Sequence, residues 1–157
     1  MTRVLAFATV APRISALGPY ATEIVAAGGE VRLACWFDPG VIPADTDLVE
    51  ARMVGGSTPQ AGAARHGTQT WWRRKLGAGH AAAASAADPV SKRWLGVKAD
   101  PWVTGQVAVS DYLVALDQDA VHPVWEFAHA HPGVRASFGL YAVIADLAGR
   151  LSLTDGR

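Results

Sequence analysis

A short apolar run that ends at two aspartates is the feature that most restricts the fold of this chain. Residues 112–116 (Tyr-Leu-Val-Ala-Leu) are followed by Asp117 and Asp119, and an apolar pattern with helical spacing begins at Val121. A wholly apolar strand is typical of a parallel sheet that is covered on both faces. Such sheets place their ligands at the carboxyl ends of the strands, so this junction is the first place to expect a site.

The rest of the chain repeats the same alternation of strand and helix. Strand-like runs at 4–8 and 31–37 enclose a helical pattern from Leu17 to Gly28, which together make a β-α-β unit. A connection of this kind joins parallel strands by a right-handed crossover. We therefore expect an α/β fold with a mostly parallel, doubly wound (Rossmann-like) sheet of about five strands and helices on both faces. Further strands are expected at 47–54, 112–116 and 134–140, and further helices from 101, 121 and 140.

The length and composition fit one folded domain over residues 1–157. Half of the residues are hydrophobic, which disfavours disorder, and the length is sufficient for one core. Residues of about 55–99 differ from the rest, because a Gly/Ala-rich loop there leads into a basic, Trp-containing helical insertion. Within this insertion, Asp88-Pro89 and Asp100-Pro101 are start signals for helices.

The charges exclude one class of partner. Acidic and basic residues balance at 14 each, so the chain is no uniformly basic nucleic-acid binder, and no nucleic-acid partner is expected. The balance hides an asymmetry, since Asp88 is the only acid between Ala51 and Ala99 and the other charged residues there are basic. One face of the protein is therefore expected to be basic.

The chain's one cysteine and its N-terminal run indicate a compartment. Cys35 alone makes neither an internal disulfide nor a cysteine-based zinc site, and its strand context predicts a small core residue. The run at 4–8 is too short for a signal peptide, and no apolar stretch approaches the roughly 20 residues that span a bilayer. We expect a cytoplasmic protein, with peripheral contact to the inner face of the membrane as a further expectation.

The first candidate site is formed by Asp117, Asp119 and His122, which follow the strand at 112–116. A carboxylate or an imidazole at a strand end can act as an acid, as a base or as an acceptor of substrate hydroxyl hydrogen bonds. A structural interpretation stands beside this one. Asp119 is suited to cap the next helix, and His122 can lie on the outer face of that helix. Asp117 has no obvious duty toward the backbone.

The second candidate is the turn after the first strand, with Thr9, Arg13, Ser15 and Gly18 as ligand-binding residues. A helix N-terminus offers free N–H groups and a partial positive charge to an anion. The Gly-x-Gly-x-x-Gly and phosphate-loop patterns are absent, so no dinucleotide cofactor is expected. The alternatives are a solvated Arg13 and a Ser15 that caps the helix.

The third candidate is a surface for a membrane or another anion within the basic insertion. Basic side chains beside indoles suit an anionic membrane surface, and they also suit a nucleic-acid strand. The alternative is that the tryptophans of this region, among them Trp94 and Trp102, pack a helical hairpin onto the sheet. The residues proposed for the contact are Trp71, Trp72, Arg73, Arg74 and Lys75.

A metal site is not expected. His129 and His131 lie near a helix end, but residues two apart do not share a helical face.

Three segments resemble the N-terminal, acceptor-side domain of GT-B type glycosyltransferases. They are Arg3–Ala8, the stretch 18–31 (Gly-Pro-Tyr-Ala-Thr-Glu-Ile-Val-Ala-Ala-Gly-Gly-Glu-Val) and Val109–Asp119. The resemblance implies a domain that binds the acceptor, with Thr9 to Gly18 and Asp117 on the acceptor side of a cleft. It also implies that an exposed basic, aromatic region can hold the protein against a membrane.

The sugar-nucleotide half of that family is absent from this sequence, so the resemblance implies that a partner chain with a nucleotide-sugar domain, or a removed C-terminal portion, supplies the donor site. Two other functions remain open. One is a non-catalytic Rossmann-like accessory or oligomerisation module, which includes a homo-oligomer. The other is a small stand-alone enzyme that processes a nucleotide or a sugar through Asp117, Asp119 and His122.

Overall fold

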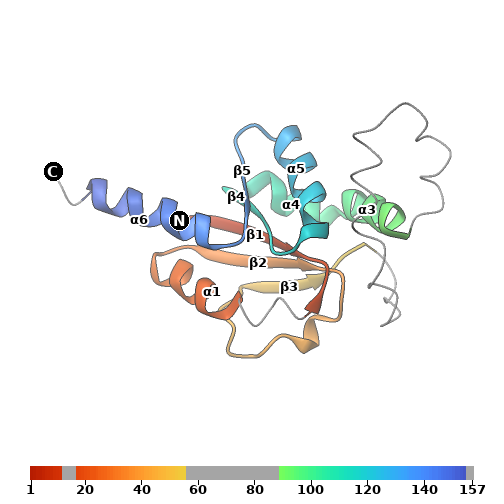
Figure 1. The fold of residues 1–157 in the computed structure, drawn as a ribbon, viewed down its shortest axis with the longest axis horizontal. Helices are drawn as coiled ribbons and strands as arrows, with labels where there is room; N and C mark the ends of the chain where they lie inside the picture. Colours follow the sequence, from red (N-terminus) through yellow and green to blue (C-terminus); the bar gives the residue numbers. More distant parts are fainter. Residues whose placement is uncertain (12–16, 56–88, 155–157) are drawn as a thin grey trace.

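A computed structural model describes residues 1–11, 17–55 and 89–154. Five parallel strands form one sheet in the order β3-β2-β1-β4-β5, with helices on both faces (Figure 1). The expected α/β, Rossmann-like fold is confirmed. The strands are β1 (Arg3–Ala8), β2 (Glu30–Cys35), β3 (Glu50–Met53), β4 (Tyr112–Ala115) and β5 (Arg135–Phe138).

The helices begin and end where the sequence carries capping signals. Asp100 caps α4 through its Oδ1, which accepts from Trp102 N at 2.9 Å, and Pro101 occupies the first turn. Gly28 follows α1 with a φ of 77°, a conformation that favours glycine. The helices are α1 (Leu17–Ala26), α3 (Pro89–Ala99), α4 (Pro101–Val109), α5 (Val121–Ala130) and α6 (Tyr141–Thr154), with 3-10 turns η2 (Pro39–Val41) and η3 (Gln118–Ala120).

Each face of the sheet has its own apolar core. Strand alternation sends Val114 to one face and Leu113 to the other. On the first face the strands pack against Ile24 of α1 and Val143 of α6. On the second face they pack against α3, α4 and α5, with Phe127 of α5 among the buried residues. This double cover explains why the two central strands are apolar from Val4 to Ala8 in β1 and along the whole of β4.

The edge strands differ from the middle strands. Strand β4 is buried along its whole length, whereas β5 is largely exposed and β3 carries Glu50 and Arg52 at its surface. Both edge strands are also shorter than the strands predicted at 47–54 and 134–140. Of the Gly/Ala-rich loop and helical insertion expected at about 55–99, residues 56–88 lie outside the described residues.

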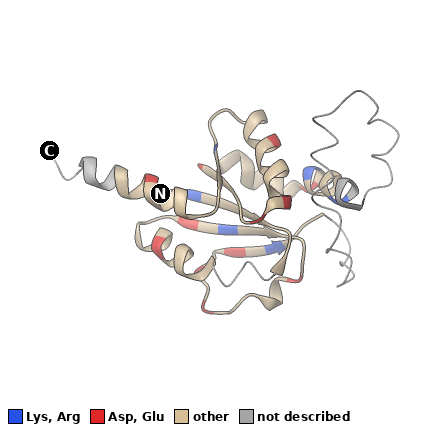
Figure 2. Cartoon of the chain, in the orientation of Figure 1, with Lys and Arg blue, Asp and Glu red and all other residues tan. Residues whose placement is uncertain are grey.

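Charged groups are distributed over the sheet rather than gathered by sign. Figure 2 shows a basic residue on β1 and both an acidic and a basic residue on each of β2 and β3. Glu30, at the start of β2, is buried between Arg3 and Arg32 and forms ion pairs with both. At the start of β4, the Tyr112 hydroxyl donates to Asp146 of α6, which also pairs with Arg135. These contacts fix the amino-terminal side of the sheet.

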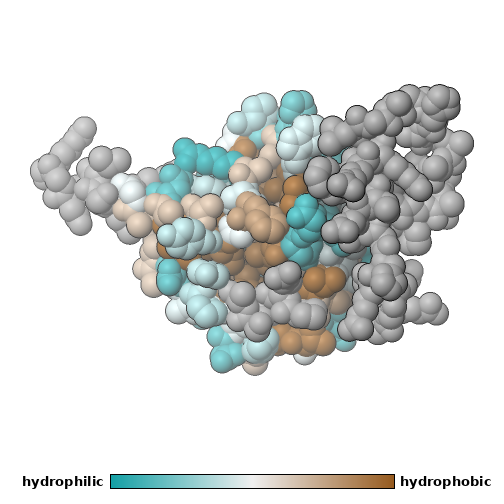
Figure 3. All heavy atoms as spheres, viewed as in Figure 1, coloured by the Kyte–Doolittle hydropathy of each residue, from teal (hydrophilic) through white to brown (hydrophobic). Residues whose placement is uncertain are grey.

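The exposed side of α6 is mildly hydrophobic. Figure 3 shows pale brown atoms along this helix, and Ala142, Ala145 and Ala148 are exposed. None of the helices in the described part of the chain is long and apolar enough to cross a membrane.

Candidate functional site

The order of the strands places a topological switch between β1 and β4. From β1 the chain leads through α1 to β2 on one side, and β4 pairs with the other side of β1. Phe7 lies beside Ala115 in this pairing, so the segments after the two strands leave the sheet next to each other. In open α/β sheets a crevice forms where neighbouring connections diverge in this way, and ligands bind there.

Asp117 joins the two segments at this switch. Its Oδ2 accepts from Thr9 N at 2.6 Å and from Val10 N at 3.3 Å. Its Oδ1 accepts from Thr9 Oγ1 at 2.8 Å and from Ala120 N at 3.1 Å. Four donors of the chain itself therefore surround a carboxylate that is 7 % exposed. Such an arrangement holds the carboxylate in place and leaves little room for a substrate atom on it.

This geometry corrects one expectation from the sequence. Asp117, and not Asp119, caps the turn after β4, and α5 begins after Ala120 without a side-chain cap. The capping residue thus lies two positions earlier than Asp119. Asp117 also accepts hydrogen bonds from backbone N–H groups, a role that the sequence did not indicate. Its partners Thr9 and Val10 are more than 100 residues away in the chain, so no local pattern could show them.

Asp119 is the other carboxyl at the switch, and it lies half-buried in η3. Burial raises the pKa of Asp119, and the negative charge of Asp117 raises it further. A carboxylate with a raised pKa is a better proton acceptor than an ordinary one. Of the two aspartates, Asp119 is therefore the one better suited to accept a proton.

The turn after β1 is described up to Ala11. Thr9 and Val10 donate to Asp117, so Thr9 is part of the predicted site as a donor to the neighbouring segment. Gly18 lies in the first turn of α1, and a Cβ placed there would meet nothing within 4 Å. Arg13 and Ser15 lie outside the described residues.

His122 is engaged with α3 and with its own helix. Its Nε2 lies 3.2 Å from Glu126 Oε1, and its ring meets the edge of Trp94 at 6.3 Å. Glu126 also accepts from Trp94 Nε1 at 3.0 Å and pairs with Lys98. Burial, the largest influence, raises the pKa of Glu126, but the hydrogen bonds from Lys98 and Trp94 and the nearby charges lower it overall. This acid joins α3 to α5. Glu126 lies four residues after His122, a spacing that places two side chains on the same face of a helix and that could have indicated this pair from the sequence.

The described tryptophans of the basic insertion have packing roles. Trp94 is 8 % exposed and lies edge-on to Phe127 with centroids 5.2 Å apart. Trp102 is half-buried; its Nε1 donates to Glu50 at 3.0 Å and its ring lies 5.6 Å from the Arg52 guanidinium carbon. These contacts agree with the interpretation that tryptophans pack helices onto the sheet. The proposed membrane residues 71–75 lie outside the described residues.

Two aromatic side chains at the carboxyl edge were not predicted as site residues. Phe138 ends β5 and is 63 % exposed, and Tyr141 begins α6 and is 70 % exposed. Gly139 between them has a φ of 76° and donates its N–H to Ala115 O at 2.8 Å. The turn holds both aromatic residues at the same edge as the switch. An exposed ring can stack on the apolar face of a sugar or on a base.

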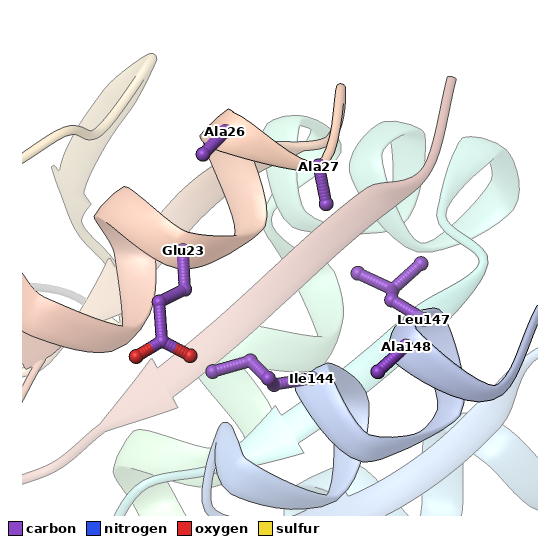
Figure 4. A pocket seen from close by; sticks show the side chains of 6 residues that line it. All are labelled: Glu23, Ala26, Ala27, Ile144, Leu147 and Ala148. Atoms are coloured by element: carbon purple, nitrogen blue, oxygen red, sulfur yellow. The ribbon is translucent and has the colours of Figure 1, made fainter. Parts of the chain in front are cut away.

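A shallow apolar hollow of about 250 Å³ lies away from this edge, between α1 and α6 (Figure 4). In the close-up the side chains of Ile144 and Leu147 reach toward α1, and the Glu23 carboxylate stands at the rim. Ala26 and Ala27 lie at the end of α1, just before β2, and Ala148 lies in α6, so the hollow does not adjoin Asp117. The lining residues are Glu23, Ala26, Ala27, Ile144, Leu147 and Ala148.

Among the residues that the structure describes, no three His, Cys, Asp or Glu side chains are placed to hold a metal ion. Cys35 is fully buried, and its thiol donates to the carbonyls of Phe37 and Arg52. Comparison of the chain with protein-family models, with curated protein sequences and with solved structures finds no match.

Proposed function

We propose that this protein is the acceptor-side domain of a GT-B-like glycosyltransferase and that it binds a hydroxyl-bearing acceptor between the ends of β1 and β4. The observation that carries the proposal is the pair of aspartates at the switch. Asp117 is satisfied by four donors of the chain, while the neighbouring Asp119 is half-buried with a raised pKa. One carboxylate that is held in place and supports the turn, next to one that can accept a proton, is an arrangement that suits a functional site.

In this proposal each residue has one role. Asp117 is a positioning residue, because it fixes Thr9 and the turn after β4 relative to each other. Asp119 accepts the hydrogen bond of an acceptor hydroxyl, and its raised pKa lets it take the proton as the hydroxyl attacks the sugar donor. Tyr141, exposed at the same edge, stacks on the acceptor ring. A partner chain with a nucleotide-sugar domain supplies the donor.

Titration of the isotopically labelled chain with a panel of simple glycosides and polyols, followed by amide NMR, tests the binding step. We expect chemical shift changes centred on Thr9, Val10 and Asp119. Asp119→Asn should weaken binding about fivefold through the loss of one hydrogen bond of about 1 kcal/mol. Glu23→Gln in the hollow between α1 and α6 is the matched control and should leave the affinity unchanged. Shifts confined to other regions, or equal affinity of the Asp119 variant, would contradict the proposal.

Association with an anionic membrane is proposed for residues 71–75. The support is the sequence alone, where Trp71 and Trp72 directly precede three basic residues. Sedimentation with vesicles that contain anionic lipid should carry down the full chain, and Arg73→Glu with Arg74→Glu should abolish this binding. Vesicles of zwitterionic lipid are the control. Equal binding by the double variant would exclude these residues as the contact.

A non-catalytic accessory or oligomerisation module is the second candidate. The observation that favours it is the exposure of β5, an edge strand whose Phe138 side chain also faces solvent. Turnover by the chain with its partner that depends on Asp119 separates the two functions, because a module without catalytic residues is indifferent to that change.

A further inference from the structure

Among the described residues, no strand pairs with the outer side of β5, so one row of its backbone groups has no strand partner there. Arg135 N donates to Asp111 O at 2.9 Å and Gly139 N donates to Ala115 O at 2.8 Å, so the odd-numbered residues face β4. Backbone groups alternate in direction along a strand. Ala136 and Phe138 therefore turn their N–H and C=O groups toward the open side of the sheet.

The middle of this edge carries no charge, proline or bulge. These features, together with short strand length, are the ones by which proteins protect edge strands. Strand β3, at the other edge, has exposed Glu50 and Arg52. In contrast, 136–138 is Ala-Ser-Phe, with Ala136 exposed and Phe138 63 % exposed. The neighbouring cation, Arg135, is held by Asp146 and lies over the Tyr112 ring, on the face that α6 covers.

We propose that β5 pairs antiparallel with β5 of a second copy of this chain, around a two-fold axis at Ser137. The register follows from the backbone. The residues with outward groups, Ala136 and Phe138, exchange hydrogen bonds when Ala136 lies opposite the partner's Phe138. Ser137 then faces the partner's Ser137 in the closely spaced, non-hydrogen-bonded position. The pairing joins two five-stranded sheets into one continuous sheet.

The side chains are self-complementary in this register, which is why the occupant is a second copy. On the face of α5, the large Phe138 ring covers the small Ala136 side chain of the partner, and the reverse pair forms by symmetry. On the face of α6, Arg135 lies opposite the partner's Gly139, which has no side chain to obstruct the guanidinium. Large beside small on both faces lets the two backbones approach to sheet spacing.

Sedimentation of the full chain over a dilution series tests the association. We expect a reversible species of twice the mass of one chain. Phe138→Lys should abolish it by placing a charge next to the same charge on the partner, because the two Phe138 side chains flank one axis. Met53→Lys, an equal change at an exposed position on β3, is the matched control and should leave the dimer intact. A monomer at every concentration, or a dimer that Phe138→Lys does not affect, overturns the proposal.

A cysteine at the axis tests the register. Opposed residues in a non-hydrogen-bonded pair have Cα atoms about 4.5 Å apart, within the range of a disulfide, so Ser137→Cys should give a covalent dimer under mild oxidation. In Ala136→Cys the two new thiols are diagonal to each other at about 7–8 Å, and little cross-linking is expected. Cys35 is buried and does not compete. Stronger cross-linking of Ala136→Cys than of Ser137→Cys would overturn the register.

This inference rests on β5 and not on the acceptor site. Asp119→Asn should leave the dimer unchanged, and the acceptor-induced amide shifts of Thr9 and Val10 should be the same in the monomer and in the dimer. Failure of one proposal is thus distinguishable from failure of the other.

Discussion

Thr9 and Asp117 are 108 residues apart in the chain and are joined by two hydrogen bonds, from Thr9 N at 2.6 Å and from Thr9 Oγ1 at 2.8 Å. The contact links the segment after β1 to the segment after β4 across the topological switch. Because one residue supplies both donors, the backbone and the side chain of Thr9 are fixed together. The carboxyl edge of the sheet therefore has a rigid centre, next to which Asp119 lies half-buried.

Asp117→Asn should destabilise the fold. The amide replaces one carboxylate oxygen with a donor that faces the N–H groups of Thr9, Val10 or Ala120, and charge-assisted hydrogen bonds are lost. We expect a loss of about 2 kcal/mol in the free energy of unfolding, measured by urea titration with tryptophan fluorescence. Gln118→Ala, a change at an exposed neighbour, is the control. A loss no larger than that of the control would mean that the carboxylate has no structural role.

Asp119→Asn should stabilise the native state at neutral pH and lose this effect in acid. The pKa of Asp119 is raised by burial and by Asp117, so folding disfavours its ionised form. The resulting penalty is present above the folded pKa and disappears as the pH falls toward the ordinary value of 3.8. Urea titrations of both proteins across this interval measure the difference. A stability difference that does not change with pH contradicts the assignment.

Cys35 should react with thiol reagents only when the protein opens. Burial, the largest influence, raises the pKa of its thiol to about 11, and the thiolate is the reactive form. Labelling by a chromogenic disulfide reagent should be slow in buffer and immediate in concentrated urea. The labelling rate in buffer should rise in Asp117→Asn, because that variant unfolds more often. Fast labelling of the native protein would show that the strand is accessible.

Glu126→Gln should weaken the attachment of α3 to α5. Glu126 accepts from Trp94 and pairs with Lys98 and His122, and loss of its charge should cost about 1 kcal/mol at neutral pH. Its pKa is lowered in the folded state, so its contribution is present above the ordinary value of 4.5 and is lost as the pH falls through the folded pKa. The variant should therefore approach the parent protein in acid. Thermal unfolding followed at several pH values measures this convergence.

Two glycine substitutions should have opposite signs. In Gly29→Ala the new Cβ would lie 2.7 Å from Ile24 Cγ2 and 3.0 Å from Ile24 O, both in the core-facing turn after α1. We expect a loss of about 1–3 kcal/mol. In Gly105→Ala, in the middle of α4, the Cβ meets nothing within 4 Å, and a gain of about 0.5–1 kcal/mol follows from helix propensity. Equal effects of the two changes in denaturant unfolding would contradict the described packing after α1.

The sequence predicted the sheet because the runs that form its two central strands, β1 and β4, are apolar without interruption. The run 112–116 and the run 4–8 became β4 and β1, side by side, and Asp100-Pro101 started α4. These features are local: each depends on a few consecutive residues and on the physics of one helix end or one strand. Parallel pairing then follows from the crossover helices between the strands.

The sequence could not predict what depends on distant pairs. It assigned the cap to Asp119 because that residue stands closest to the helix, whereas the donors from Thr9 and Val10 draw Asp117 into the role. The exposure of Phe138 and Tyr141 depends on β5 being an edge strand, and the order of the strands cannot be predicted from any single segment. The acceptor site and its donor-carrying partner remain predictions.

The central position of β1 has a consequence for synthesis on the ribosome. This strand leaves the exit tunnel before both of its neighbours and soon pairs with β2, but its other side has no partner until residues 112–115 have been translated. During that interval an apolar ribbon with vacant main-chain groups is open to any extended nascent peptide nearby. Prompt pairing of β4 with β1 therefore favours correct folding of this chain over aggregation with other nascent chains on the same mRNA.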